Sequence, residues 1–302
     1  MATGSDFARD ISYVPEVTFG TTPGTPSMKF LRFTGGFANI EKPGFVSEEI
    51  RSDGQIADMR HGMRRVNGDL GFELSYGAFD DWLEAALGGT WTTNVLKAGR
   101  TPRFFSLEER HTDITQYAAT TGVVVNTFSL NIQPEAMVTG SFGIVGRNQS
   151  WSGTSLGTPT AAGTAPPFSG FTGAIEEGGG AVANLTALEF SMTRNVEPIF
   201  VVGPADTAKE MNIGQNVLTG TATFLLEDAT MINKFLNEDE SSIEVTLDGP
   251  SGDDLTILIP RLKYTGAARQ RGVGTSIVVS MPFQALYDNT AASNIVLTRI
   301  PA

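Results

Sequence analysis

GDLGFELSYGAFDDWLEAAL occupies residues 68–87, and GTATFLLEDATMINKFL occupies residues 220–236. Each stretch begins with glycine and then alternates apolar and polar residues, which is the period of a half-buried strand. Each then changes to apolar residues spaced three and four apart, which is the pattern of an amphipathic helix. The chain therefore predicts the same strand and helix twice, with Phe72 and Phe224 separated by 152 positions (224 − 72).

The apolar positions of the two stretches form the predicted core. They lie on one face of each expected strand and on one side of each expected helix, with one inserted residue in the second copy. We interpret the aromatic residues of the first helix as packing residues. The predicted core consists of Phe72, Leu74, Phe79, Trp82, Leu83, Phe224, Leu226, Ile232, Phe235 and Leu236.

The flanking segments also repeat in the same order. LTALEFSMT at residues 185–193 corresponds to KFLRFTG at residues 29–35, and a long polar loop follows each of them. Strand patterns and a hairpin follow each expected helix. We therefore predict a mainly β fold with two tandem similar β-sandwich or barrel units, each with one flanking α-helix.

Composition suggests where the units begin and end. The early stretch YVPEVTFGTTPGTP is rich in proline and glycine, which disfavour a long helix or a central strand. A later stretch is dominated by Gly, Ser, Thr, Pro and Ala, as linkers are. The expected division is an extended arm at 1–27, a first unit at 28–146, a linker at 147–184 and a second unit at 185–302.

Charge and composition narrow the function classes. The chain has 33 acidic and 21 basic residues, a formal net charge of −12. Such a chain is a poor ligand for nucleic-acid phosphates and for anionic membranes, which attract Lys and Arg. It contains no cysteine, and no stretch approaches the roughly 18 apolar residues of a membrane helix. Its first residues lack the pattern of a secretory signal.

No catalytic constellation stands out in the sequence. His61 and His111 have no partners at metal-ligand spacing, and no nucleophile elbow or phosphate-binding loop is present. Adjacent acidic pairs such as Glu48 and Glu49 are typical of a solvated surface. We therefore expect no enzyme activity, cofactor or metal. Two alternatives stay open: a two-domain β-sandwich module for carbohydrate binding or adhesion, and a β-rich glycan hydrolase with a carboxylate pair.

An ordered set of short segments resembles a known family, the major tail (tail tube) proteins of long-tailed bacteriophages with non-contractile tails. The segments are YVPEVTFGTTPGTP, EEIRSDGQ, GDLGFELSYGAFDDWLEAALGG, VTGSFG, KFLNE and MPFQAL. The resemblance extends from about Tyr13 to Phe283. The resemblance implies a structural virion protein, made in the host cytoplasm, whose rings stack into a tube that conducts DNA. It also implies contacts with tape-measure, tail terminator and distal tail proteins.

The resemblance also assigns roles to segments. Loops 43–67 and 203–217 match the loop that joins neighbouring subunits, and the arm matches an inter-ring arm with contact residues Tyr13, Val14, Val17 and Phe19. We expect DNA to pass through without specific binding, and no membrane insertion. The candidate lumen-facing acids are Glu48, Glu49, Asp53, Asp58, Asp206 and Glu210.

Counting units predicts the ring. In the family that the chain resembles, a tube around duplex DNA commonly has sixfold character, and three chains with two copies of the unit each supply six copies. The predicted ring is a trimer with pseudo-sixfold symmetry. The alternative is a ring of six whole chains, with the second unit on the outside.

Overall fold

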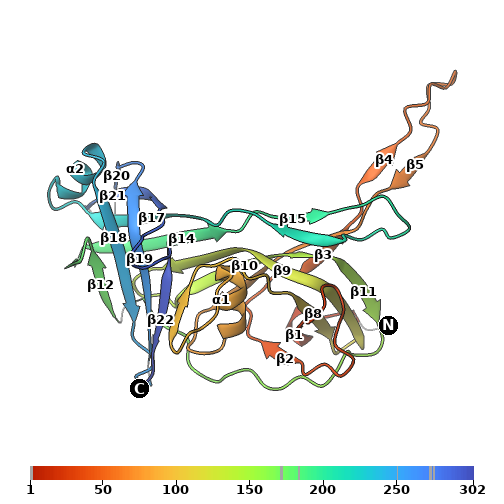
Figure 1. Cartoon of the computed structure of the whole chain (residues 1–302), viewed down its shortest axis with the longest axis horizontal. Helices are drawn as coiled ribbons and strands as arrows, with labels where there is room; N and C mark the ends of the chain where they lie inside the picture. Colours follow the sequence, from red (N-terminus) through yellow and green to blue (C-terminus); the bar gives the residue numbers. More distant parts are fainter. Residues whose placement is uncertain (1–2, 171–172, 183, 250, 272–273, 275) are drawn as a thin grey trace.

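The computed structural model describes residues 3–170, 173–182, 184–249, 251–271, 274 and 276–302. The chain is mainly β, as predicted (Figure 1). Its helices are α1 (Asp80–Leu87), α2 (Thr230–Leu236) and the 3-10 turn η1 (Asp6–Ala8). Its strands are β1 (Arg9–Pro15), β2 (Lys29–Leu31), β3 (Ala38–Glu41), β4 (Gly44–Val46), β5 (Met59–His61), β6 (Arg65–Glu73), β7 (Val95–Lys97), β8 (Phe105–His111), β9 (Gln116–Ile132), β10 (Thr139–Gly146), β11 (Asn148–Ser152), β12 (Ala174–Glu177), β13 (Gly180–Ala181), β14 (Leu185–Thr193), β15 (Val196–Ile199), β16 (Glu210–Ile213), β17 (Val217–Leu225), β18 (Glu240–Leu247), β19 (Asp254–Tyr264), β20 (Ala268–Arg271), β21 (Ile277–Ala285) and β22 (Val296–Ile300).

The strands of the first half pair in the order β3–β6–β10–β9–β8–β1–β2. Strand β9 serves two sheets, because its first part pairs with β8 and β11 and its last part pairs with β10. Gly122 lies at the irregularity where β9 shifts register against β8, with a φ of 65°, a backbone conformation that glycine adopts without strain.

The second half repeats this pattern of pairing. Strand β17 pairs with β14 and β21, as β6 pairs with β3 and β10. Strand β19 pairs with β18 and β21, as β9 pairs with β8 and β10. A hairpin precedes the central strand in each half, β4–β5 in the first and β15–β16 in the second.

Two antiparallel ladders join the two halves, β9–β14 and β7–β22, and in the second of these Leu96 lies opposite Leu297. Strand β14 pairs with β9 from Leu188 opposite Ile132 to Thr193 opposite Thr127. The sheet of the first half thus continues through β14 into β17 and β21 of the second half. The sheets stay open, and no barrel closes within the described residues.

Aromatic side chains fill the core of the first half. Phe72 stacks on Phe142 with ring centroids 4.4 Å apart, and Trp82 stacks on Phe105 at 5.1 Å. Helix α1 covers this cluster and buries Trp82 and Leu83. The other predicted core residues that are buried are Leu74, Phe79 and Phe224.

Helix α2 differs from the expectation of a second buried helix. None of its residues is buried, and Leu236 is 66% exposed. Ile232 and Phe235, with Leu226 just before the helix, are only partly buried against the core. Leu236 is therefore a surface residue of this chain, because α2 covers the end of its sheet with one side only.

Two segments expected to be an arm and a linker contribute strands to the sheets. In the segment 1–27, β1 pairs with β8 along seven residues, from Arg9 opposite His111 to Pro15 opposite Phe105. In the segment 147–184, β11 pairs with β9 and β12 pairs with β18. The glycine and proline content of these segments indicated an arm and a linker. Short strands still form there, because a short strand needs only a few extended residues.

Candidate functional site

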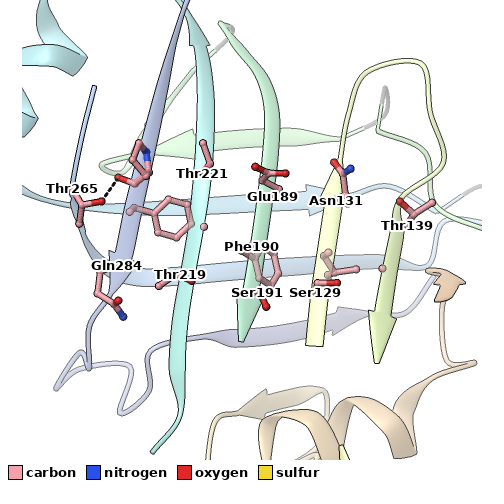
Figure 2. Close-up of a pocket in the computed structure, with 15 residues that line it drawn as sticks. Ser129, Asn131, Thr139, Glu189, Phe190, Ser191, Thr219, Thr221, Thr265 and Gln284 are labelled. Atoms are coloured by element: carbon pink, nitrogen blue, oxygen red, sulfur yellow. Dashed lines mark hydrogen bonds between the residues drawn. The ribbon is translucent and has the colours of Figure 1, made fainter. Parts of the chain in front are cut away.

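The joined sheet presents a polar face that crosses both halves (Figure 2). Residues directly opposite one another form rows across strands β6, β10, β9, β14, β17 and β21. The first row is Glu73, Thr139, Asn131, Glu189, Thr221 and Pro282. The second row is Gly71, Ser141, Ser129, Ser191, Thr219 and Gln284. We call these twelve residues the polar face.

The alternation of the strands places apolar residues on the opposite side. The row between the two polar rows consists of Phe72, Gly140, Leu130, Phe190, Gly220 and Phe283. Its large side chains are buried in the core. One side of the sheet therefore packs on the core, while the other side presents hydroxyls and amides.

The polar face is concave. A cavity of about 690 Å³ lies over it, between Thr139 at one side and Gln284 at the other. Ser129 and Ser141 share a hydrogen bond of 2.8 Å, and the Thr265 hydroxyl donates to the Pro282 carbonyl at 3.2 Å.

The charge of the polar face is negative. Glu73 and Glu189 are its charged residues, and none of its twelve positions holds Lys or Arg. Asp69 lies one row further along β6 and is exposed. Lys263 on β19 continues the second row beyond Gln284. The twelve positions themselves offer carboxylates and hydroxyls but no cation, so they repel a polyanion rather than bind it.

The hairpins form the second candidate surface. Hairpin β4–β5 projects away from the body of the protein (Figure 1). Its exposed apolar side chains are Phe45, Val46, Ile50, Ile56 and Met59. Hairpin β15–β16 instead packs on the first half, where Val196, Ala208 and Met211 form a buried cluster with Val124.

The predicted lumen acids lie on these hairpins and not on the polar face. Glu48 and Glu49 are exposed in the tip of β4–β5, and Glu210 is exposed on β16. The other three pair within the chain: Asp53 with Arg51 at 2.7 Å, Asp58 with Arg60 at 3.4 Å, and Asp206 with Lys42 at 2.9 Å and Arg64 at 2.8 Å.

Asp206 joins the two halves at the base of the projecting hairpin. Its carboxylate accepts hydrogen bonds from Lys42, just before β4, and from Arg64, just after β5. The Arg64 amide also donates to the Asp206 carbonyl at 2.7 Å. The hydrogen bond from Lys42, followed by that from Arg64, lowers the pKa of Asp206.

The predicted arm residues are divided between core and surface. Tyr13 and Val14 on β1 are buried, and the Tyr13 hydroxyl donates to Asp81 at 3.1 Å. Phe19 packs on Phe104 with ring centroids 4.9 Å apart. Val17 is 97% exposed. Tyr13 and Val14 are therefore core residues of the chain, whereas Val17 is exposed.

Sequence reasoning missed the acids that the structure places on and beside the polar face, Asp69, Glu73 and Glu189. The alternation of each strand could have revealed these acids. The residues between the apolar ones face away from the core, and polar residues recur at these positions from strand to strand. Across the part of the chain that the structure describes, no group of three or more His, Asp or Glu side chains is placed to hold a metal ion. None of the described helices is long and apolar enough to cross a membrane.

The sequence has a clear match among protein families. The family model described as phage tail tube protein matches residues 8–285, which is most of the chain. A search of curated proteins finds no match.

Proposed function

Because the chain belongs to the phage tail tube protein family, we propose that it is the major subunit of a tail tube, in which stacked rings form the conduit for DNA ejection. It is a structural protein of the virion, made in the host cytoplasm. Its partners are other copies of itself and, from the resemblance, the tape-measure, terminator and distal tail proteins.

The observation that carries this proposal is the polar face, which runs without interruption across both halves. A conduit for DNA needs a wall that does not bind phosphates, because contacts with Lys and Arg supply most of the affinity for nucleic acid. The polar face has carboxylates and small hydroxyls and no basic residue. We therefore assign this face to the lumen, with Glu73 and Glu189 as its acids and Asp69 beside it.

The six acids of the two hairpin loops take a smaller part in this proposal. Asp53, Asp58 and Asp206 are neutralised by basic side chains of the same chain. Glu48, Glu49 and Glu210 remain exposed and unassigned to a lining row. They contribute to the lumen potential only where the hairpins reach the channel.

The repeat of strand pairing supports a ring of three chains. Each chain supplies two similar units, at 28–146 and 185–302, so three chains form six units in a closed ring with true threefold symmetry. The units have unlike helices, α1 buried and α2 exposed, so alternating positions around the ring differ. A ring of six whole chains is the alternative.

Cryo-electron microscopy of the purified protein tests both the tail tube function and the ring of three chains. We expect tubes whose rings contain three chains of 32.1 kDa and six lobes, with β9–β14 in the wall. Six chains in each ring would exclude the trimer. A protein that stays monomeric at high concentration, with no rings in any salt condition, would exclude the tail tube function.

A further inference from the structure

The two hairpins are equivalent residue by residue. Adding 152 to the pair Gly44–His61 gives the pair Val196–Ile213, and adding 152 to Val46–Met59 gives Pro198–Met211. The same shift relates the strands beside them, since Ala38 pairs with Gly68 as Phe190 pairs with Gly220. Both hairpins therefore have the same length and the same register.

Hairpin β15–β16 is docked on the first half of its own chain. Ala208 and Met211 are 1% and 8% exposed, in a cluster with Val124. The Arg147 Nε donates to the Ala208 carbonyl at 2.9 Å, and Arg64 binds Asp206 just before it. The docking site thus lies between the start of β6 and the end of β10.

Hairpin β4–β5 presents the equivalent residues to solvent. Ile56 corresponds to Ala208 (208 − 152) and is 72% exposed. Met59 corresponds to Met211 (211 − 152) and is 50% exposed. These side chains are apolar. Among the described residues, none buries them as Ala208 and Met211 are buried in the second hairpin.

The second half has an empty counterpart of the docking site. The pair Val124–Val145 corresponds to Lys263–Gln284, a shift of 139 on both strands (263 − 124 and 284 − 145). The same shift takes Arg147 to Leu286 and Asn148 to Tyr287, while Arg64 corresponds to Asn216 (216 − 152). Asn216, Gln284, Leu286 and Tyr287 line one cavity of about 990 Å³.

We propose that this cavity receives the β4–β5 hairpin of a second copy of the chain, with Ile56 where Ala208 lies in the first half. The hairpin of the same chain is not the occupant, because Lys42 and Arg64 hold its base on Asp206 beside the first half. The contact is head-to-tail, so repeating it three times closes the ring of the proposed function, on which this inference rests.

Cross-linking tests the contact directly, because the chain contains no cysteine. Chains with Ile56→Cys and chains with Tyr287→Cys are mixed, assembled and treated with a short bismaleimide. The matched control replaces Ile56→Cys by Ile50→Cys in the same hairpin. Ile50 is 98% exposed, and its counterpart Val202 (50 + 152) is 106% exposed, so this position does not dock.

We expect a cross-linked dimer from the Ile56–Tyr287 mixture and at least tenfold less from the Ile50–Tyr287 mixture. A double Ile56→Cys, Tyr287→Cys chain should give a ladder that ends at the trimer. Ile56→Asp should prevent ring formation while the monomer stays folded, and Ile50→Asp should not. Rings that form without the Ile56–Tyr287 product would overturn this inference and leave the proposed function standing. If the wild type forms no rings, the proposed function fails and this inference fails with it.

Discussion

The ring of Phe72 on β6 lies against Gly140, directly opposite on β10: a Cβ added to Gly140 would come 2.6 Å from the Phe72 Cζ. In the second half, Phe283 on β21 lies against Gly220 on β17 in the same way, at 2.5 Å. Each half therefore uses a glycine without a side chain to seat an aromatic ring on its sheet.

Truncating the core phenylalanines should strongly destabilise the subunit. Phe72→Ala and Phe224→Ala each remove a fully buried ring and leave a cavity, so we expect each to lower the free energy of unfolding by about 3–5 kcal/mol. Leu236→Ala is the control, and it should change that free energy by less than about 0.5 kcal/mol because Leu236 is exposed. Urea denaturation of the three variants measures this. A loss of comparable size at Leu236 would contradict the burial described here.

The sequence predicted the strands and α1 well, because their periods are set by burial on one face. The switch from alternation around Phe72 to helical spacing around Trp82 needs no knowledge of the rest of the chain. The same reasoning failed at Leu236, since helical spacing indicates an apolar side but not whether another element covers it. It also misjudged Tyr13, whose proline-rich surroundings resemble an arm while β1 pairs with β8 in the core.

The polar face lay beyond sequence reasoning for a different reason. Its rows join residues such as Asn131 and Glu189, which are opposite each other only because β9 and β14 pair across the two halves. That long-range pairing leaves no local pattern. The candidate acids were instead sought in polar loops, where the carboxylates of Asp53 and Asp206 prove to be paired within the chain.

Arg194 should be a key contact between the halves. It directly follows β14, and its buried guanidinium donates to the Ala85 carbonyl near the end of α1. Burial lowers its pKa to about 10, so it stays cationic at neutral pH. We expect Arg194→Ala to cost about 1–3 kcal/mol through the unpaired carbonyl alone. Denaturation against the exposed control Arg269→Ala checks this, and equal stability of the two variants would refute it.

Glu109 should make stability depend on pH. Its buried carboxyl accepts the Ala38 amide at 2.6 Å and lies 3.7 Å from Arg9, and burial is the main cause that raises its pKa above 4.5. A carboxyl group whose pKa is higher in the folded than in the unfolded protein stabilises the folded state at pH values below the unfolded pKa. This stabilisation is lost as the pH rises through the folded pKa. Relative to Glu109→Gln, the wild type should therefore lose free energy of unfolding as pH rises from the unfolded pKa, about 4.3, through the raised folded pKa. Parallel curves for the two proteins would exclude this effect.

Asp206→Asn should loosen the base of the projecting hairpin without unfolding the subunit. The substitution removes the negative charge that faces Lys42 and Arg64. Because the pKa of Asp206 is lowered, the wild-type contact should hold above pH 3.8 and weaken as pH falls through the lowered value. Hydrogen exchange of the amides around β4 and β5 measures this, with Asp58→Asn as the control, since Asp58 pairs only within the hairpin. If the amides around β4 and β5 exchange at the same rate in Asp206→Asn as in the wild type, Asp206 does not hold the base of the hairpin.

Placing cations on the polar face should retard DNA. Ser129 and Ser191 face each other across the β9–β14 ladder, at the centre of the second polar row. Both side chains point away from the core, so Ser129→Lys with Ser191→Lys should leave the fold intact and give each chain two cations on the proposed lumen wall. Lysines attract phosphates most strongly at low ionic strength, because salt screens the interaction. Phage carrying both substitutions should assemble tails of normal length and eject DNA more slowly, with the delay shrinking as salt increases.

The matched control is Ser129→Gln with Ser191→Gln, which adds side-chain length without charge. Phage with this control pair should eject DNA at the wild-type rate. Normal ejection by the lysine variant at low salt would place the polar face outside the channel.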